Sequence, residues 1–274
     1  MMKTSLTGIT AASRDLSVIS NNLANALTTG FKRSSAQFTD IMGSSATERP
    51  SADIGVGALT QDIRRSQTQG TIDTTDRSLD LAISGDGYFG FREPKVEGDP
   101  MYVYSRSGKL TIDADGMLTD QQGRALMGLS VGANGNVTGT SPTPINLKSA
   151  AGGDLNSISS LSINPQGVIT MTKTDGTQKA VGAVALAHFT NPEALKSQTG
   201  AVMTETDRSG LAEFKRAGAN GLGIIQQGAL EGSNVDLTAE MLRMINAQQA
   251  YNGNARALQT GSEMLRSAIE NLTR

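Results

Sequence analysis

The residues that could carry out catalysis or hold a metal are few and scattered along this sequence. Cys and Trp are absent, and the one histidine, His188, lies in the apolar stretch Val184–Phe189, with no acidic residue or nucleophile nearby in the sequence. Zinc sites built from Cys and His are therefore excluded. A histidine in a strand-like apolar segment is more typical of a structural role than of acid–base chemistry.

Three short motifs resemble ligand-binding loops but lack residues that the chemistry needs. The stretch from Asp113 to Gly116 lacks the third ligand and the final Glu of a calcium loop, so it favours a β-turn. The pairs Gly55/Gly57 and Gly221/Gly223 each supply two glycines of a dinucleotide-binding loop, but Thr60 and Gln226 occupy the place of the third. The sequence thus predicts no catalytic, cofactor-binding or metal-binding residue and no enzyme activity.

The charge and hydropathy patterns exclude two classes of partner. The 274 residues include 24 basic and 26 acidic side chains, for a net charge of -2, without a Lys/Arg-rich stripe. Binding several phosphates needs such a stripe, so we expect no nucleic acid partner. No run approaches about 18 apolar residues, and polar residues interrupt the N-terminal stretch, so we expect no membrane insertion and no cleaved signal peptide.

Both ends of the chain carry apolar residues at alternating spacings of three and four, which indicates α-helices with a heptad stripe. The N-terminal stripe contains Ile9, Leu16, Ile19 and Leu23, with Leu6 beside it, and ends before Gly30. The C-terminal stripe contains Leu237, Met241, Met244, Tyr251, Leu258, Leu265, Ile269 and Leu272. Asn234 or Asp236 can cap the second helix.

Between the helices, short alternating segments are separated by turn dipeptides, which is typical of antiparallel hairpins. The dipeptides are Asp115-Gly116, Asn134-Gly135, Gln166-Gly167 and Asp175-Gly176. We therefore predict an α+β protein in which the two terminal heptad helices pair as an antiparallel coiled-coil-like unit around a central antiparallel β domain. The predicted regions are an N-terminal helical region 1–42, an extended linker 43–75 with a strand or two, the β domain 76–214, a Gly-rich linker 215–233 and the C-terminal helix 234–274.

The two helices allow two arrangements, which the stripes alone do not separate. The helices can close on each other within one globular protein, or they can join copies of the chain. The C-terminal stripe also contains Gln248 and Ser262, and both stripes are rich in small or flexible side chains. Such helices gain most from packing on several neighbours, which favours assembly. All the stripe residues of both helices are therefore predicted to lie at a subunit interface.

Several separated stretches resemble the axial proteins of the bacterial flagellum, the rod and hook family. The stretches are Leu16 to Asn25 with Thr29 to Arg33, Ser78 to Phe89, Tyr104 to Gly108 with Asp113 to Leu118, and Gly228 to Leu237 with Met244, Gln248 and Tyr251. The resemblance implies a structural subunit that assembles into a helical tube around an export channel. It also implies export by the flagellar apparatus, and neighbours among rod, hook-cap and hook–filament junction proteins.

The position in the flagellum stays open between two members of the family. Thr60 to Asp62 and the stretch from Ala185 to Pro192 look more like a hook protein, which would be extracellular and transmit torque from rod to filament. The short, polar stretch from Met42 to Gly55 also favours a flexible hook. The length of the chain favours a distal or proximal rod protein of the basal body, because many hook proteins carry an added outer domain. We expect a hook protein, with a rod protein as the alternative.

Overall fold

The computed structural model combines helices with mostly antiparallel sheets, and it describes residues 2–42, 55–93, 102–132, 137, 139, 141–219 and 221–272. The chain forms two units: unit 1 contains residues 1–26, 33–66 and 235–274, and unit 2 contains residues 27–32 and 67–234. The α+β prediction is confirmed. The chain crosses between the units at residues 26/27, 32/33, 66/67 and 234/235.

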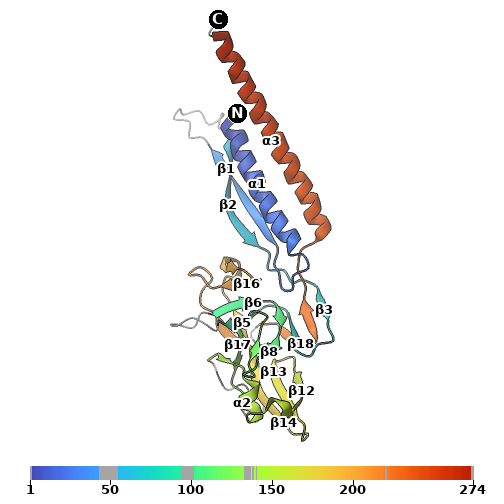
Figure 1. Ribbon diagram of the computed structural model, residues 1–274. Coiled ribbons are helices and arrows are strands. Elements are labelled where there is room, and N and C mark those ends of the chain that lie inside the picture. The colour runs from blue at the N-terminus through green and yellow to red at the C-terminus, as the bar shows by residue number, and fades with distance from the viewer. Residues whose placement is uncertain are drawn as a thin grey trace. The chain divides into compact units, whose positions relative to one another are not determined.

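Unit 1 contains two long helices that lie side by side and run in opposite directions (Figure 1). They are α1 (Met2–Ala24) and α3 (Leu237–Leu272). The carboxylate of Asp236 accepts hydrogen bonds from the amides of Thr238 and Ala239 at 2.8 and 3.1 Å, so it caps α3 as the sequence predicted.

The register of the two helices is fixed by close contacts along their length. A Cβ added at Gly261 would lie 3.5 Å from Met2, and one added at Gly8 would lie 2.7 Å from the Asn254 side chain. Near the other end, the amide of Asn22 lies 3.4 Å from the carboxylate of Glu240. The small residues let the helix backbones approach closely at one end, and a polar contact joins them at the other.

A β-hairpin lies along α1 and completes unit 1 (Figure 1). It consists of β1 (Ser34–Met42) and β2 (Gly55–Arg65), paired antiparallel from Ser34↔Arg65 onward. The buried amide of Asn22 donates to the carbonyl of Ser34 at 2.7 Å and accepts from its N–H at 2.9 Å, which fixes the start of β1.

The hairpin corrects one detail of the sequence prediction. The range 1–42 was expected to be the N-terminal helical region but contains β1, whereas β2 lies in the range 43–75, where a strand or two was expected. The reason is that Asn22, a residue of the preceding helix, sets where β1 begins, and no periodicity reveals such a contact. The stretch 43–54, on which the flexible-hook expectation relied, lies outside the described residues.

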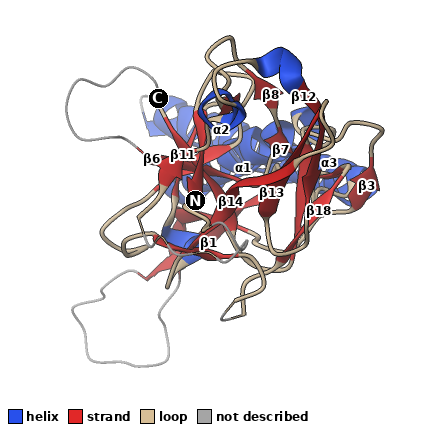
Figure 2. Ribbon diagram, turned by 90° about the horizontal axis from the view of Figure 1, so that it is seen from below, coloured by secondary structure: helices blue, strands red, loops and turns tan. Residues whose placement is uncertain are grey.

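Unit 2 consists largely of strands and the loops between them (Figure 2). Its first strands are β3 (Ile72–Thr74), β4 (Asp80–Ser84), β5 (Tyr88–Arg92), β6 (Tyr102–Ser105), β7 (Gly108–Lys109), β8 (Thr111–Ile112), β9 (Leu118–Thr119), β10 (Ala125–Leu129) and β11 (Thr143–Pro144). The helix α2 (Leu147–Ala151) and a short helical turn (Leu155–Ser157) follow. The remaining elements are β12 (Ile158–Ile163), β13 (Val168–Lys173), β14 (Gln178–His188), a second turn (Pro192–Ala194), β15 (Lys196–Gln198), β16 (Val202–Thr204), β17 (Glu213–Arg216), β18 (Ile224–Gln227) and β19 (Ala229–Glu231).

The strands of unit 2 form one large sheet and two small ones. The path β12-β13-β14-β10-β5-β6-β16-β15 runs through the large sheet, while β18-β4-β7 and β19-β3 form the small ones. Strands β18 and β19 lie in the range 215–233 that was expected to be a linker. The sequence did not predict β18 and β19, because their partners β4 and β3 lie far away in the sequence and the pairs form no local hairpin.

The core of unit 2 is closed, with Phe89, Phe91, Leu126, Ile169 and Leu186 fully buried. The predicted turns are confirmed where the structure describes them. The amides of Gly116, Gly167 and Gly176 each donate to a carbonyl three residues earlier at 2.8 to 2.9 Å, and each has a positive φ. The Asn134-Gly135 turn lies outside the described residues.

Gly108 and Gly253 give a matched pair of substitutions with opposite expected effects. A Cβ at Gly108 would lie 2.0 Å from the backbone oxygen of Leu81, whereas a Cβ at Gly253 on α3 would meet nothing within 4 Å. We expect Gly108→Ala to lower the free energy of unfolding by about 1–3 kcal/mol through strain between β4 and β7. Gly253→Ala should instead stabilise α3 by about 0.5–1 kcal/mol. Urea denaturation of the full chain, followed by circular dichroism, measures both, and a neutral Gly108→Ala would contradict the close approach of the two strands.

Candidate assembly interface

The predicted interface residues lie on α1 and α3, but they differ in exposure. Leu6, Leu237, Met241, Tyr251, Leu265 and Ile269 are exposed, and Ile9, Leu16, Leu23, Met244 and Leu258 are partly buried. Ile19 is buried inside unit 1 and leaves little surface for another molecule. Leu272 ends α3, and its side chain lies outside the described residues. The exposed members can contact another molecule without any rearrangement of unit 1.

The less exposed positions of α3, from Glu240 onward, follow a heptad pattern that differs from the predicted stripe. They are Glu240, Met244, Ala247, Asn254, Ala255, Leu258 and Gly261. Met244, Ala255 and Leu258 belong to both stripes, but positions 240, 247 and 261 are less exposed than the predicted 241, 248 and 262, and Asn254 joins Ala255. The two stripes differ because small and polar residues of α3 contact α1, whereas the predicted stripe was defined mainly by apolar residues.

The end of α3 extends past the start of α1. Met2 lies opposite Gly261, and α3 continues for 11 residues to Leu272, a length of about 16 Å. Leu265 follows Leu258 by one heptad, and Ile269 follows four residues later, so the α1-facing stripe continues along this extension. Leu265 and Ile269 are 52% and 61% exposed. The extension therefore presents the same kind of surface that α1 covers in the rest of the helix.

Two other exposed apolar groups lie in unit 1. Leu237, Met241 and Ile245 recur every four residues on the first turns of α3, with Leu242 beside them. Phe38, Leu59 and Ile63 are exposed on the hairpin. These side chains add to the apolar surface that unit 1 leaves exposed.

Unit 2 contains a buried ion cluster centred on Glu231. The carboxylate of Glu231 lies 2.7 Å from the ammonium of Lys32 and 3.3 Å from the guanidinium of Arg106, and the three side chains are at most 4% exposed. The amide of Gly70 also donates to this carboxylate at 3.1 Å. Burial lowers the pKa of Lys32, and the hydrogen bond to Glu231 opposes that shift. The cluster joins segments that are far apart in the sequence.

Unit 1 contains a similar cluster centred on the buried Glu240. Its carboxylate pairs with Arg33 and lies 3.4 Å from the amide of Asn22 and 3.9 Å from Arg243. Burial raises the pKa of Asp15, and the neighbouring charge of Glu240 raises it further, while Arg33 acts in the opposite direction. The positive charge of Arg33 therefore acts on the negative charges of both Glu240 and Asp15.

The adjacent cations Lys32 and Arg33 thus serve different units. Lys32 pairs with Glu231 in unit 2, and Arg33 pairs with Glu240 in unit 1. Lys32, Arg33 and Glu231 lie in the family-like stretches of the sequence, but the sequence alone assigned them no role. The signal available in the sequence was the pair of basic residues at the 32/33 crossing and the acidic Glu231 close to the 234/235 crossing.

The remaining sites offer little for chemistry. Within the described ranges, no group of three His, Asp or Glu side chains could hold a metal ion. His188 ends β14 with an exposed side chain, in register with Glu213 of β17. No helix in the described part of the chain is long and apolar enough to cross a membrane.

Comparison with known proteins identifies the family. Residues 2–32 match the flagella basal body rod protein model, residues 82–171 match the flagellar hook protein FlgE/F/G D1 domain, and residues 226–271 match the flagellar basal body rod FlgEFG protein C-terminal model. The flagellar basal-body rod protein FlgG of Buchnera aphidicola from Acyrthosiphon pisum is 33% identical, with 95% of each chain covered. FlgG of Borreliella burgdorferi is 31% identical, covering 96% of this chain and 94% of its own.

The chain belongs to the rod and hook family of flagellar axial proteins. Proteins of this family are structural, so the chain is a structural subunit rather than an enzyme. The flagellar hook protein FlgE of Salmonella typhimurium is 24% identical over 405 aligned positions, covering 96% of this chain and 98% of its own. The expectation of a hook protein is therefore less well supported than its rod alternative, because the rod relatives are both more similar and of matching length.

Neutralising Glu231 should destabilise unit 2 strongly. Glu231→Gln keeps the side-chain shape but leaves Lys32 and Arg106 buried without their counter-charge, and losing one partner of a buried pair costs about 3–5 kcal/mol. The exposed pair of Lys215 and Glu213, 2.5 Å apart, supplies the control Glu213→Gln, which should leave the urea midpoint unchanged. Equal midpoints for the two variants would show that the Glu231 cluster does not stabilise unit 2.

Proposed function

We propose that this protein is a rod subunit of the bacterial flagellar basal body, which assembles with copies of itself into a helical tube. The observation that carries the proposal is the extension of α3 past α1, where Leu265 and Ile269 continue the α1-facing stripe and remain exposed. A protein that functioned alone would leave this apolar surface in water. In a tube, neighbouring copies would cover it.

The energy of this contact suits assembly from many repeated contacts. Fully burying a Leu or Ile side chain contributes about 1.5–3 kcal/mol, so covering the exposed half of Leu265 and Ile269 contributes a few kcal/mol at most. A single contact of that size is weak. In a helical tube each copy would make the contact twice, once through each surface, and the other exposed apolar groups of α1, α3 and the hairpin would add to it.

The rod assignment over the hook rests on length and similarity. The alignments with the rod relatives span almost the full length of both chains. The alignment with the hook relative extends over 405 positions, whereas this chain has 274 residues. In this proposal α1 and α3, within 1–42 and 234–274, pair in the manner of a coiled coil and form the inner tube around an export channel. The β region between them forms an outer layer.

The proposal also implies a location and neighbours. The protein would lie in the basal body after export by the flagellar apparatus without a cleaved signal peptide, next to other rod proteins. As a hook protein it would instead lie outside the cell, near the hook-cap and hook–filament junction proteins. Gold labelling of an epitope-tagged chain in isolated hook–basal bodies separates these positions. Label confined to the rod is expected, and label along the hook would overturn the rod assignment.

A charge on the extension of α3 should block assembly without unfolding unit 2. Leu265→Asp and Ile269→Asp each place a carboxylate in a surface that must lose water on assembly. Ser267→Asp is the matched control, because Ser267 lies on the opposite face of the same helical turn. We expect purified Leu265→Asp to form no tubes by electron microscopy, while Ser267→Asp forms tubes like the unmodified chain. If all three variants form tubes equally well, the stripe of Leu265 and Ile269 does not lie at the subunit interface.

A further inference from the structure

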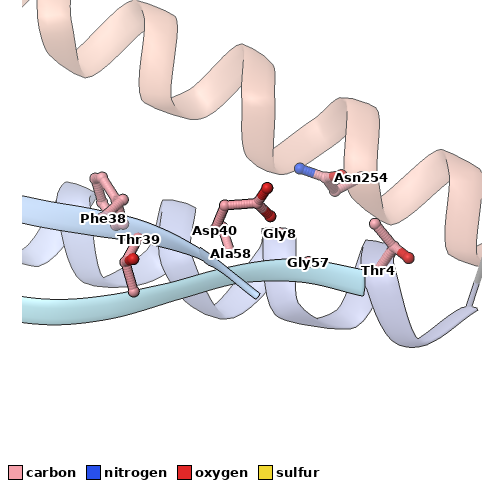
Figure 3. Close-up of a pocket in the computed structure, with 8 residues that line it drawn as sticks. All are labelled: Thr4, Gly8, Phe38, Thr39, Asp40, Gly57, Ala58 and Asn254. Atoms are coloured by element: carbon pink, nitrogen blue, oxygen red, sulfur yellow. The ribbon is translucent and has the colours of Figure 1, made fainter. Parts of the chain in front are cut away.

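Unit 1 contains an open groove whose walls come from four elements (Figure 3). Its volume is about 410 Å³, and it is lined by Thr4 and Gly8 of α1, Phe38, Thr39 and Asp40 of β1, Gly57 and Ala58 of β2, and Asn254 of α3. Glycine and alanine supply several of the lining positions, so a second backbone can come close. All the lining residues belong to unit 1.

The groove combines one acidic group with one apolar group. Phe38 and Asp40 are two residues apart on β1 and point to the same side, while Thr39 points away (Figure 3). Phe38 is 43% exposed, and the exposed Asp40 forms no ion pair with any residue in the described ranges. A complementary segment would bring an apolar side chain and a cation within one turn of each other.

The extension of α3 carries this combination. Arg266 lies between Leu265 and Ile269 in the sequence and borders the apolar stripe on the helix surface. Like Asp40, Arg266 forms no ion pair within the described part of the chain. The helix therefore offers Arg266 for the carboxylate and Leu265 or Ile269 for the phenyl ring.

The extension cannot reach the groove of its own molecule. Arg266 follows Asn254 by 12 residues in one continuous helix, which places it about 18 Å further along the helix axis. Asn254 itself is part of the groove wall, so the helix would have to break for Arg266 to return. Only the α3 extension of another copy can bring Arg266 to Asp40.

We propose that the groove of one copy receives the Leu265–Ile269 segment of a second copy, with Arg266 paired to Asp40. This inference rests on the proposed self-assembly and specifies which two surfaces meet. Two parallel copies displaced by about 18 Å along α3 would bring the groups to the same level. Because the two surfaces differ, the contact is heterologous and repeats from copy to copy without closing.

Charge exchange tests the pairing. Asp40→Arg and Arg266→Asp should each raise the protein concentration needed for tube formation at least about tenfold, because each places like charges together. The double variant Asp40→Arg/Arg266→Asp should restore tube formation. Asp62→Arg on the same hairpin is the control and should behave like the unmodified chain. Single variants that assemble normally, or a double variant that fails while both single variants also fail, would overturn the pairing.

Cross-linking in assembled flagella gives a readout that does not depend on purified tubes. The chain has no cysteine, so the variant Asp40→Cys/Arg266→Cys carries only the two introduced thiols. Treating isolated basal bodies with a short bifunctional maleimide should give a ladder of multimers, while either single-cysteine variant should give none. Monomers alone from the double variant, or a link to a different segment or protein, would overturn the pairing. Failure of the unmodified chain to enter flagella would overturn the proposed function itself.

Discussion

The buried carboxylate of Glu231 joins segments of unit 2 that lie far apart in the sequence. Strands β3 and β19 have three residues each and form a two-stranded sheet by themselves. Such a short sheet buries too little apolar surface to be stable alone. Lys32 and Arg106 reach Glu231 from two other segments, so one anion fixes the places where the chain enters and leaves the unit. Removing one member of such a cluster is costly, because the remaining charges stay buried without their counter-charge.

The two units handle their apolar surface in opposite ways. In unit 2 the large side chains of the core, such as Phe89 and Leu126, have no contact with water. In unit 1 several of the larger apolar side chains of α3 and the hairpin remain about half exposed, and much of the helix contact comes from small and polar residues. Unit 2 is therefore built as a self-contained fold, whereas unit 1 retains apolar surface suited to further partners.

The sequence predicted the features of the fold that repeat locally. The heptad spacing located both helices, Asp236 marked the start of α3, and glycine dipeptides marked hairpin turns. Strands β1, β18 and β19 were missed, because Asn22 determines where β1 begins and strands remote in the sequence pair with β18 and β19. These contacts leave no periodic trace in the sequence.

The candidate site was predictable only to a limited extent, for a related reason. The spacing of apolar residues located the two helices. It placed the α1-facing stripe of α3 on a slightly different face from the observed one, because Glu240, Asn254 and Gly261, which are not large apolar residues, form much of that contact. The two buried ion clusters could not be predicted, because the sequence does not show that the adjacent cations Lys32 and Arg33 pair with different carboxylates. The sequence also favoured a hook protein, which the relatives support less well than the rod alternative, because the motifs that the sequence shares belong to the whole family.

During synthesis, the Asn22–Glu240 contact can form only after nearly the whole chain has been made. The two residues are 218 positions apart, so at about 5–20 residues per second the ribosome releases α1 about 10 to 40 seconds before its partner exists. Unit 2 is complete in sequence once Asn234 has been made, whereas unit 1 waits for the last forty residues. The many Ser, Thr and Asn side chains of α1 keep the waiting segment hydrated. A product that terminates shortly after Asn234 therefore carries the complete sequence of unit 2 without a helical partner for α1.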